Sequence, residues 1–344
     1  MMETKTSYKG MFALLLLILV VVFLLNLSLG SVSIPMDEVF ASLSGGEVSK
    51  SSWKYIVLDY RLPKAITAVM VGGGLAIAGL LMQTLFRNPL AGPFVLGLSS
   101  GASLGVALLI LGAGTFGGLL GGLLASEWSL VIASALGSFL VLLAVLAMTL
   151  RIKDTMAILI IGLMFGSLTA AVVGVLSYFS SAEKLQQYVF WSFGSLGNQS
   201  WTGVLILSGC TLFGITLSLL ASKSLNALLL GQNYAKSMGV RIKRTTLLII
   251  IATSILAGGI TAFAGPIAFI GLAVPHIARQ WITSANHRIL IPAVLLFGSI
   301  ILLLCDSIAQ LPFSEYTLPI NAITSLIGAP VVIWLLVRKR KLLF

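Results

Sequence analysis

The distribution of charge constrains this chain more than any other feature, because Asp, Glu, Lys and Arg are absent from nine long windows. These charge-free windows are residues 10–36, 65–86, 88–126, 128–150, 155–182, 185–222, 245–278, 289–305 and 316–337. A helix needs about 20 apolar residues to cross ~30 Å of hydrocarbon, and lipid offers no partner for backbone groups outside helices or closed barrels. With 58% hydrophobic and only 9% charged residues, a water-soluble fold is excluded. The alternation typical of barrel strands is absent, so we expect an all-α, polytopic integral membrane protein.

The windows divide into about ten transmembrane helices. Residues 245–278 are too many for one helix, and Pro266 and Pro275 interrupt them, so we expect two helices there, the second short and broken. The expected spans are 11–29, 61–84, 94–113, 128–150, 156–179, 201–221, 245–264, 267–281, 289–311 and 319–337. The first span is too long for a signal peptide and no A-x-A-like site follows it, which favours a retained helix. Residues 1–344 therefore form a single transmembrane domain.

The basic residues predict an orientation. With the N-terminus in the cytoplasm and ten spans, 16 of the 21 lysines and arginines lie inside and 5 outside. Basic residues that flank membrane spans collect on the cytoplasmic side. The net charge of +11 is thus explained by topology and does not indicate nucleic-acid binding, and both termini are expected to be cytoplasmic.

The longest inner loop, residues 222–244, reads SKSLNALLLGQNYAKSMGVRIKR. It is too polar to span a membrane and too apolar for a solvated linker. Apolar residues three and four apart indicate short helices, which Gly231 and Gly239 punctuate. The residues alone leave two interpretations open: an amphipathic segment on lipid headgroups, or a segment that docks into the groove of a partner.

Two features concern the second span and the turn after it. The string FRNPLAGP, residues 86–93, carries two prolines and a glycine that predict a tight, non-helical hairpin. Within the span, small residues recur at spacings that allow close helix packing. They are Gly72, Gly73, Gly74, Ala76, Ala78 and Gly79.

Few polar side chains within the spans are candidates for chemistry. Asp306 is the one clear ionisable case, and its place near the outer end of a span favours a solvated or structural role. His276 and His287 are expected at the interface, since no metal-ligand or acid–base spacing accompanies them. Cys210 and Cys305 are interpreted as small buried hydrophobes. The sequence has no phosphate-cradling G-x-x-x-x-G-K-[ST] loop, so no catalytic or metal site is predicted.

Arg61 and Lys64 lie one helical turn apart at the outer mouth of the second span. Two interpretations are open: they anchor the helix end at lipid headgroups, or they meet carboxylates of an acidic soluble partner.

Several strings resemble one known family in the family's order. RLPKAITAVMVGGGLAIAGLLMQTLFRNPLAGPFVLGLSSGASLG (61–105) is similar to the signature stretch of the iron-siderophore, haem and vitamin B12 permeases, the membrane subunits of type II ABC importers. Later blocks resemble the family too: LLLGQNYAKSMGV (228–240), GPIAFIGLAVPHIAR (265–279), NHRILIPA (286–293) and LPINAITSLIGAPVVIWLL (318–336). The match runs from about residue 61 to 340 and is weakest over 113–200.

The resemblance implies roles for particular residues. Residues 228–240 match the coupling helices that sit in a cleft of the ATP-hydrolysing subunit, with the coupling positions Leu230, Gly231, Ala235, Gly239 and Val240. Arg61 falls on a periplasmic arginine that pairs with a glutamate of the substrate-binding protein, and Lys64 falls on a second basic position. Gln310 and Leu311 stand where the family has another docking arginine. Thr317 stands where the family tends to have a glutamate, with Glu315 two residues earlier.

The resemblance also implies a function. The chain is expected to be the permease subunit of an importer that moves an iron chelate (siderophore or haem) or cobalamin from a periplasmic or lipid-anchored substrate-binding protein into the cytoplasm of a bacterium. It would bind no cofactor, because ATP and magnesium belong to the partner ATPase. A second copy, in a homodimer rather than a heterodimer, would complete the pathway. The candidate pathway residues are Gly73, Ala76, Met82, Gln83, Ser99, Ser100 and Ser103.

The alternative is an ion-coupled secondary transporter. Pro266 and Pro275 resemble the breaks in the discontinuous helices of such proteins. Against this alternative, the spans carry no Asp or Glu near the membrane midplane that could bind a coupling ion.

Overall fold

The structure is a computed structural model that describes residues 8–112, 128–152, 154–197, 199–312, 314 and 316–338. All the regular elements among these residues are helices. The long ones are α1 (Lys9–Ser28), α4 (Leu62–Phe86), α5 (Leu98–Ile110), α7 (Trp128–Arg151), α8 (Thr155–Tyr178), α10 (Trp201–Leu229), α12 (Ile242–Ala264), α13 (Ile270–Trp281), α14 (His287–Ala309) and α15 (Ile320–Arg338). The short ones are α2 (Met36–Ser44), α3 (Ser51–Tyr55), the π-helix η1 (Ile56–Arg61), the 3₁₀ helix η2 (Pro93–Leu96), α9 (Ala182–Ser192) and α11 (Gln232–Ser237).

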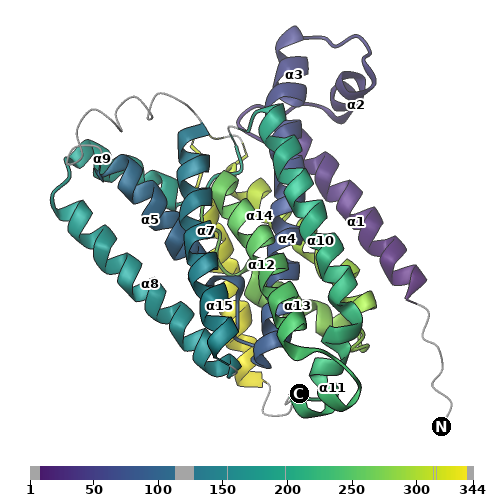
Figure 1. Ribbon diagram of the computed structural model, residues 1–344. Coiled ribbons are helices and arrows are strands. Elements are labelled where there is room, and N and C mark those ends of the chain that lie inside the picture. Colours follow the sequence, from purple (N-terminus) through teal and green to yellow (C-terminus); the bar gives the residue numbers. More distant parts are fainter. Residues whose placement is uncertain are drawn as a thin grey trace.

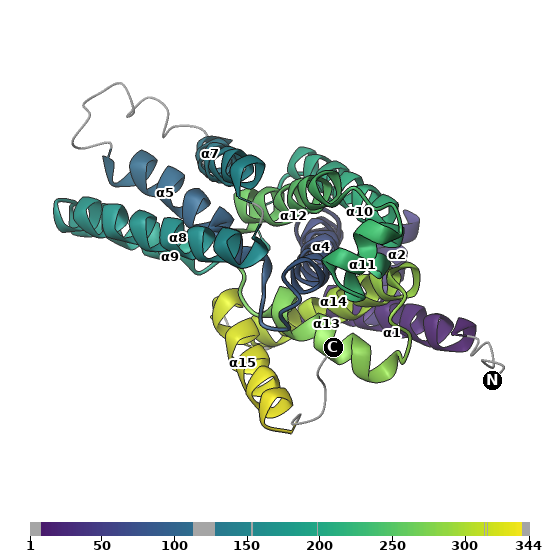
Figure 2. The same ribbon diagram turned by 60° about the horizontal axis from the view of Figure 1, so that its bottom comes forward.

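α4 is the central helix of the bundle. It packs against α14, α10, α12 and α13, and these helices surround it in the view of Figure 2. The helices α5, α7, α8 and α9 lie together on one side, α15 borders another face, and α1 packs on α14. In Figure 1, α2 and α3 lie at one end of the bundle and α11 at the other. We call these the outer end and the inner end.

Glycine allows α4 to approach its neighbours at backbone distance. A Cβ atom on Gly72 would overlap the carbonyl oxygen of Gly298 in α14, and one on Gly79 would overlap that of Gly271 in α13. Backbones can approach this closely only where side chains are absent. The packing role expected for the small residues of the second span is therefore confirmed.

Local signals in the sequence account for several helix ends. The side chains of Asp154, Ser200 and Asn286 accept hydrogen bonds from backbone N–H groups of the first turns of α8, α10 and α14, as N-capping residues do. α4 ends where Arg87 adopts a left-handed conformation. The chain then turns through the proline-containing hairpin to η2, as residues 86–93 predict.

The expectation of about ten spans agrees with the structure. Among the described residues, seven helical segments are long and apolar enough to cross a membrane, and the apolar helices α5 and α15 are shorter. Residues 245–278 do form two helices: α12 ends at Ala264, Gly265 takes a left-handed φ of 70°, and the 12-residue α13 follows. Some details differ from expectation, among them the short outer helices α2 and α3, which were not expected. The third span begins at Leu98 rather than residue 94, α10 continues to Leu229, and α9 was not expected.

The close contact between α4 and α13 can be tested with one methyl group. Gly79→Ala places a Cβ against the Gly271 carbonyl, and we expect the free energy of unfolding to fall by at least ~1–3 kcal/mol through overpacking. Thermal unfolding of the purified chain in detergent measures the effect. The matched control is Gly209→Ala in α10, where a Cβ meets nothing within 4 Å. A Gly79→Ala protein as stable as this control would refute the packing.

Candidate functional site

The inner loop folds around one short helix. After α10 ends, Gly231 takes a φ of 102°, α11 follows, and Gly239 takes a φ of 83° before α12 begins. Residues with a Cβ rarely adopt such φ values, so these two glycines are required by the turns that they make. The loop is also tied together by backbone hydrogen bonds from Ala235 N–H to Gly231 and from Val240 N–H to Ala235.

Three apolar side chains of this loop point to solvent. Leu230, Tyr234 and Met238, spaced four residues apart, are 60%, 55% and 59% exposed. We call these three the α11 face. Exposed apolar side chains that gather in this way mark a contact surface, for a protein partner or for a membrane. Ala235, in contrast, is fully buried and Val240 packs on the core, so these two coupling candidates shape the loop rather than form its surface.

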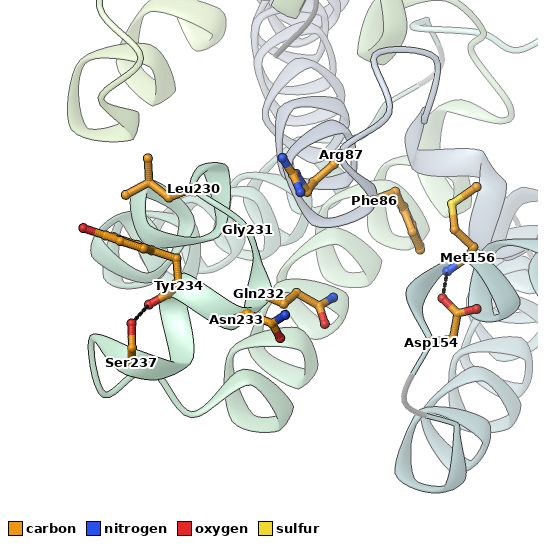
Figure 3. A pocket seen from close by; sticks show the side chains of 10 residues that line it. All are labelled: Phe86, Arg87, Asp154, Met156, Leu230, Gly231, Gln232, Asn233, Tyr234 and Ser237. Carbon is orange, nitrogen blue, oxygen red and sulfur yellow. Dashed lines mark hydrogen bonds between the residues drawn. The ribbon is translucent and has the colours of Figure 1, made fainter.

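A groove of about 900 Å³ lies beside the loop (Figure 3). Phe86 and Arg87, from the end of α4, line one part of it, and Asp154 and Met156, from the start of α8, line another. Gln232 and Asn233 lie on the side of Asp154, whereas the side chains of Leu230 and Tyr234 point the other way. The inner end therefore combines an exposed apolar face with an adjacent open groove. The other lining residues are Gly231 and Ser237.

At the outer end, Arg61 is buried and hydrogen-bonded to the backbone. Its Nη1 donates to the carbonyls of Leu27 at 2.7 Å and Ser28 at 2.8 Å, and its Nη2 donates to the carbonyl of Val32. These three acceptors lie at the end of α1 and in the segment after it. Arg61 thus fixes α1 to the start of α4, and its guanidinium is already engaged inside the chain.

Lys64 and Asp306 form a buried ion pair. Lys64 Nζ lies 2.9 Å from Asp306 Oδ1, with side-chain exposures of 12% and 3%. The second carboxylate oxygen accepts hydrogen bonds from Asn26 at 3.0 Å and Gln310 at 2.8 Å. We call these four residues the outer polar cluster. They connect α1, α4 and α14, so of the two roles expected for Asp306, the structural one describes its place and the solvated one does not.

A small cavity of about 300 Å³ opens beside the outer polar cluster. Its walls include Lys64 and Asp306, the rings of Tyr60, Phe190 and Phe193, and Thr317. Glu315 lies outside the described residues. The docking role of Arg61 and Lys64 stays a prediction, and their burial adds a condition: each cation must first leave its internal partners.

The pathway candidates separate into two groups. Gly73, Ala76, Met82 and Gln83 on α4 are buried among neighbouring helices of the same chain, because α4 is central in the bundle. Their pathway role stays a prediction. Ser99, Ser100 and Ser103 on α5 are only partly buried, and their pathway role stays a prediction.

Ring nitrogens of both histidines lie at hydrogen-bond distance from other segments of the bundle. His276 Nε2 lies 2.8 Å from the carbonyl oxygen of Pro89 in the hairpin after α4. His287 is fully buried, with Nε2 2.9 Å from Thr84 Oγ1 and Nδ1 2.8 Å from Asn226 Oδ1. His287 thus lies at the inner end of α14, as expected, and both of its ring nitrogens are partnered inside the bundle. Cys305 is buried, as expected, and Cys210 is partly buried.

Within the described residues, no group of three His, Cys, Asp or Glu side chains could hold a metal ion. The features found instead are an exposed apolar face at the inner end and polar clusters that tie helices together. The sequence pattern indicated the first, since Leu230, Tyr234 and Met238 are apolar residues in a polar loop. It did not indicate which helices the polar side chains join.

Comparisons with known proteins agree with this architecture. A model of the FecCD transport family matches residues 18–338. The chain is 36% identical to the hemin transport system permease protein HmuU of Yersinia pestis, covering 99% of both chains. It is 34% identical to the vitamin B12 import system permease protein BtuC of Klebsiella pneumoniae, covering 98% of this chain and 96% of that one. A solved metal-chelate type ABC transporter in an inward-facing conformation matches with a TM-score of 0.84 and 31% identity, over 96% of this chain and 100% of that chain.

These similarities define the class as the transmembrane permease subunits of ATP-binding-cassette importers, which are transport proteins and not enzymes. This chain belongs to the FecCD transport family. It is a multi-pass membrane protein, and its family implies a separate ATPase and a substrate-binding protein as partners. Nothing in these findings supports the ion-coupled alternative.

The outer ion pair gives a stability prediction. Lys64→Met leaves the Asp306 carboxylate buried without its cation, and breaking a buried pair on one side costs about 3–5 kcal/mol. We expect a large fall in thermal stability in detergent. The double variant Lys64→Met/Asp306→Asn, which removes both charges, should regain at least half of the loss. A Lys64→Met protein with wild-type stability would contradict the pairing.

Proposed function

We propose that this permease imports a bulky metal chelate, with haem, a ferric siderophore and cobalamin as the candidates, and that its ATPase subunit docks on the α11 face. The observation that carries the docking proposal is the exposure of Leu230, Tyr234 and Met238. Three apolar residues on one side of a loop match helix-in-groove recognition. Of the two interpretations left open by the sequence, membership of an ABC importer family favours the partner over lipid headgroups.

The substrate class rests on the relatives. HmuU is named for hemin transport and BtuC for vitamin B12 import, and the solved neighbour is a metal-chelate type transporter. These substrates are large planar or globular chelates of a metal ion. Such a cargo suits a permease whose described spans contain no set of residues able to bind the metal itself.

The remaining arrangement follows from the same proposal. The inner end, which carries α11, faces the cytoplasm of a bacterium whose inner membrane holds the protein, and both termini lie on that side. ATP and magnesium bind the ATPase subunits. A second copy of this chain forms a homodimer with the first, and the pathway lies between the copies, with Ser99, Ser100 and Ser103 as candidate lining residues. A substrate-binding protein approaches the outer end near Arg61 and Lys64.

A charge on the α11 face tests the docking. Tyr234→Glu places a carboxylate in an apolar contact without a partner, and we expect the amount of ATPase subunit that co-purifies in detergent to fall at least tenfold, as for a central contact residue. Phe40→Glu is the matched control, because Phe40 is a similarly exposed aromatic at the outer end, 53% against 55%. Co-purification of Tyr234→Glu equal to that of Phe40→Glu would refute docking at α11.

Transport in proteoliposomes tests the energy source and the cargo. The assembled complex, with its substrate-binding protein, should accumulate one of labelled haemin, cyanocobalamin or a ferric hydroxamate only when ATP is enclosed with the ATPase. A proton ionophore should leave the rate unchanged, because the proposed coupling is through ATP. Accumulation driven by a proton gradient without ATP would contradict the proposal.

A further inference from the structure

A chain of hydrogen bonds between side chains joins the coupling loop to the central helix at the inner end. It runs from Asn226 in the last turn of α10, through His287 at the start of α14, to Thr84 near the end of α4. We call Thr84, Asn226, Asn286 and His287 the inner polar cluster. In Figure 2, α11 lies next to the ends of α4, α10 and α14, where this cluster is found.

Backbone groups determine the orientation of the cluster. The N–H of His287 donates to Asn226 Oδ1 at 2.9 Å, and the N–H of Arg288 donates to Asn286 Oδ1 at 3.0 Å. Both side-chain atoms are therefore oxygens, and Asn226 Nδ2 donates to Asn286 Oδ1 at 2.9 Å. His287 Nδ1 must then donate to Asn226, so in a neutral ring Nε2 accepts the single proton of the Thr84 hydroxyl, which is then not donated to the Leu80 carbonyl 2.9 Å away.

The cluster has a defined place in the coupling machinery. Asn226 precedes Leu230, the first residue of the α11 face, by one helical turn, so a displacement of α11 reaches Asn226 directly through α10. On the other side, Thr84 lies two residues before the end of α4. Next to Thr84, Gln83 bonds to Arg279 and to the Leu272 carbonyl of α13. The inner end of α4 is thus connected to three other helices.

Geometry distinguishes this connection from apolar packing. Apolar contacts resist compression but permit sliding, whereas the two hydrogen bonds between His287 and Asn226 and the one between His287 and Thr84, all of 2.8–2.9 Å, hold both distance and direction. A buried His287 that lost either partner would leave an unsatisfied polar atom, which is costly. These hydrogen bonds therefore favour a joint movement of α10, α14 and α4 at the inner end.

We infer that the Asn226–His287–Thr84 connection transmits the displacement of the coupling loop to the central helix, with His287 as a positioning residue for the coupling of ATP hydrolysis to transport. The inference rests on the proposed docking of the ATPase at the α11 face. Its rival is a cluster that only stabilises the fold while apolar packing transmits the motion.

A matched pair of isosteric substitutions on α4 tests the inference. Thr84 and Thr67 are both fully buried, and each hydroxyl oxygen lies at hydrogen-bond distance from the carbonyl oxygen four residues earlier, Leu80 at 2.9 Å and Pro63 at 2.8 Å. Only Thr84 also contacts His287. Thr84→Val and Thr67→Val therefore differ in the loss of that one connection, and Thr84→Ser keeps the hydroxyl.

The measurement is the ATPase rate of the assembled complex in proteoliposomes, with and without chelate-loaded substrate-binding protein. We expect Thr84→Val to bind the ATPase and keep its basal rate but to lose stimulation about fivefold, within the range of known coupling changes. Thr67→Val and Thr84→Ser should be stimulated as the wild type is. Equal stimulation of Thr84→Val and Thr67→Val would overturn the inference.

Two substitutions of His287 keep the inference testable if Thr84→Val fails to fold. His287→Asn retains an amide near the position of Nδ1, and His287→Gln retains one near Nε2, so each breaks one of the two links. Either should assemble and lose stimulation. If Thr84→Val and both His287 variants fail to assemble with the ATPase, the cluster is purely structural and the inference is overturned.

The two proposals fail in different ways. If Tyr234→Glu still holds the ATPase, docking at the α11 face is wrong. If Tyr234→Glu releases the ATPase while Thr84→Val couples normally, docking stands and only the transmission through His287 is wrong.

Discussion

Hydrocarbon offers no hydrogen-bond partner, so an ionised or strongly polar side chain buried in this bundle needs a partner within the protein. The structure meets this constraint at the two ends of α4. The Lys64–Asp306 pair ties α4 to α14 at the outer end, and Thr84 and His287 tie the same two helices at the inner end. Asn26 adds α1 to the outer cluster, and Asn226 adds α10 to the inner one. A single helix is thereby fixed at both ends, one near the expected approach of the substrate-binding protein and the other next to the coupling loop.

Between its two ends, α4 contacts the backbones of neighbouring helices at glycine residues. Gly72 meets Gly298 of α14 and Gly79 meets Gly271 of α13, which leaves little space for helices to change their separation. Packed interiors of this kind respond to force by shifts of rigid elements rather than by gradual deformation. The centre of the permease therefore suits a mechanism in which α4 and its neighbours move as a unit. The exposed helix α8 lies at the opposite side of the bundle from α1.

Much of the fold could be predicted from the sequence, because charge-free length is a physical requirement for each span. α9 was missed because its residues Glu183 and Lys184 interrupt the apolar pattern and the helix is too short to cross a membrane. The apolar composition of the inner loop indicated the exposed α11 face. The partner of Asp306 could not be found in the same way, since pairs between helices depend on how the helices pack. For the same reason the spacing of the small residues on α4 predicted close packing but not which helices they contact.

A distance between two spin labels tests most directly whether the central helix α4 moves with the coupling loop. One label is placed at Lys236→Cys in α11 and the other at Leu90→Cys in the hairpin after α4. Both positions are exposed, and native Cys210 and Cys305 would be replaced by alanine. For the distance within one chain, labelled chains are diluted with unlabelled ones. In a separate sample, the distance between Lys236 labels on two copies reports that α11 has moved. Both distances are measured in the full complex, without nucleotide and trapped with ATP and vanadate. The account predicts an unchanged Lys236–Leu90 distance when the distance between copies changes. A change of ~5 Å, about one helical turn, in the distance within one chain would contradict it.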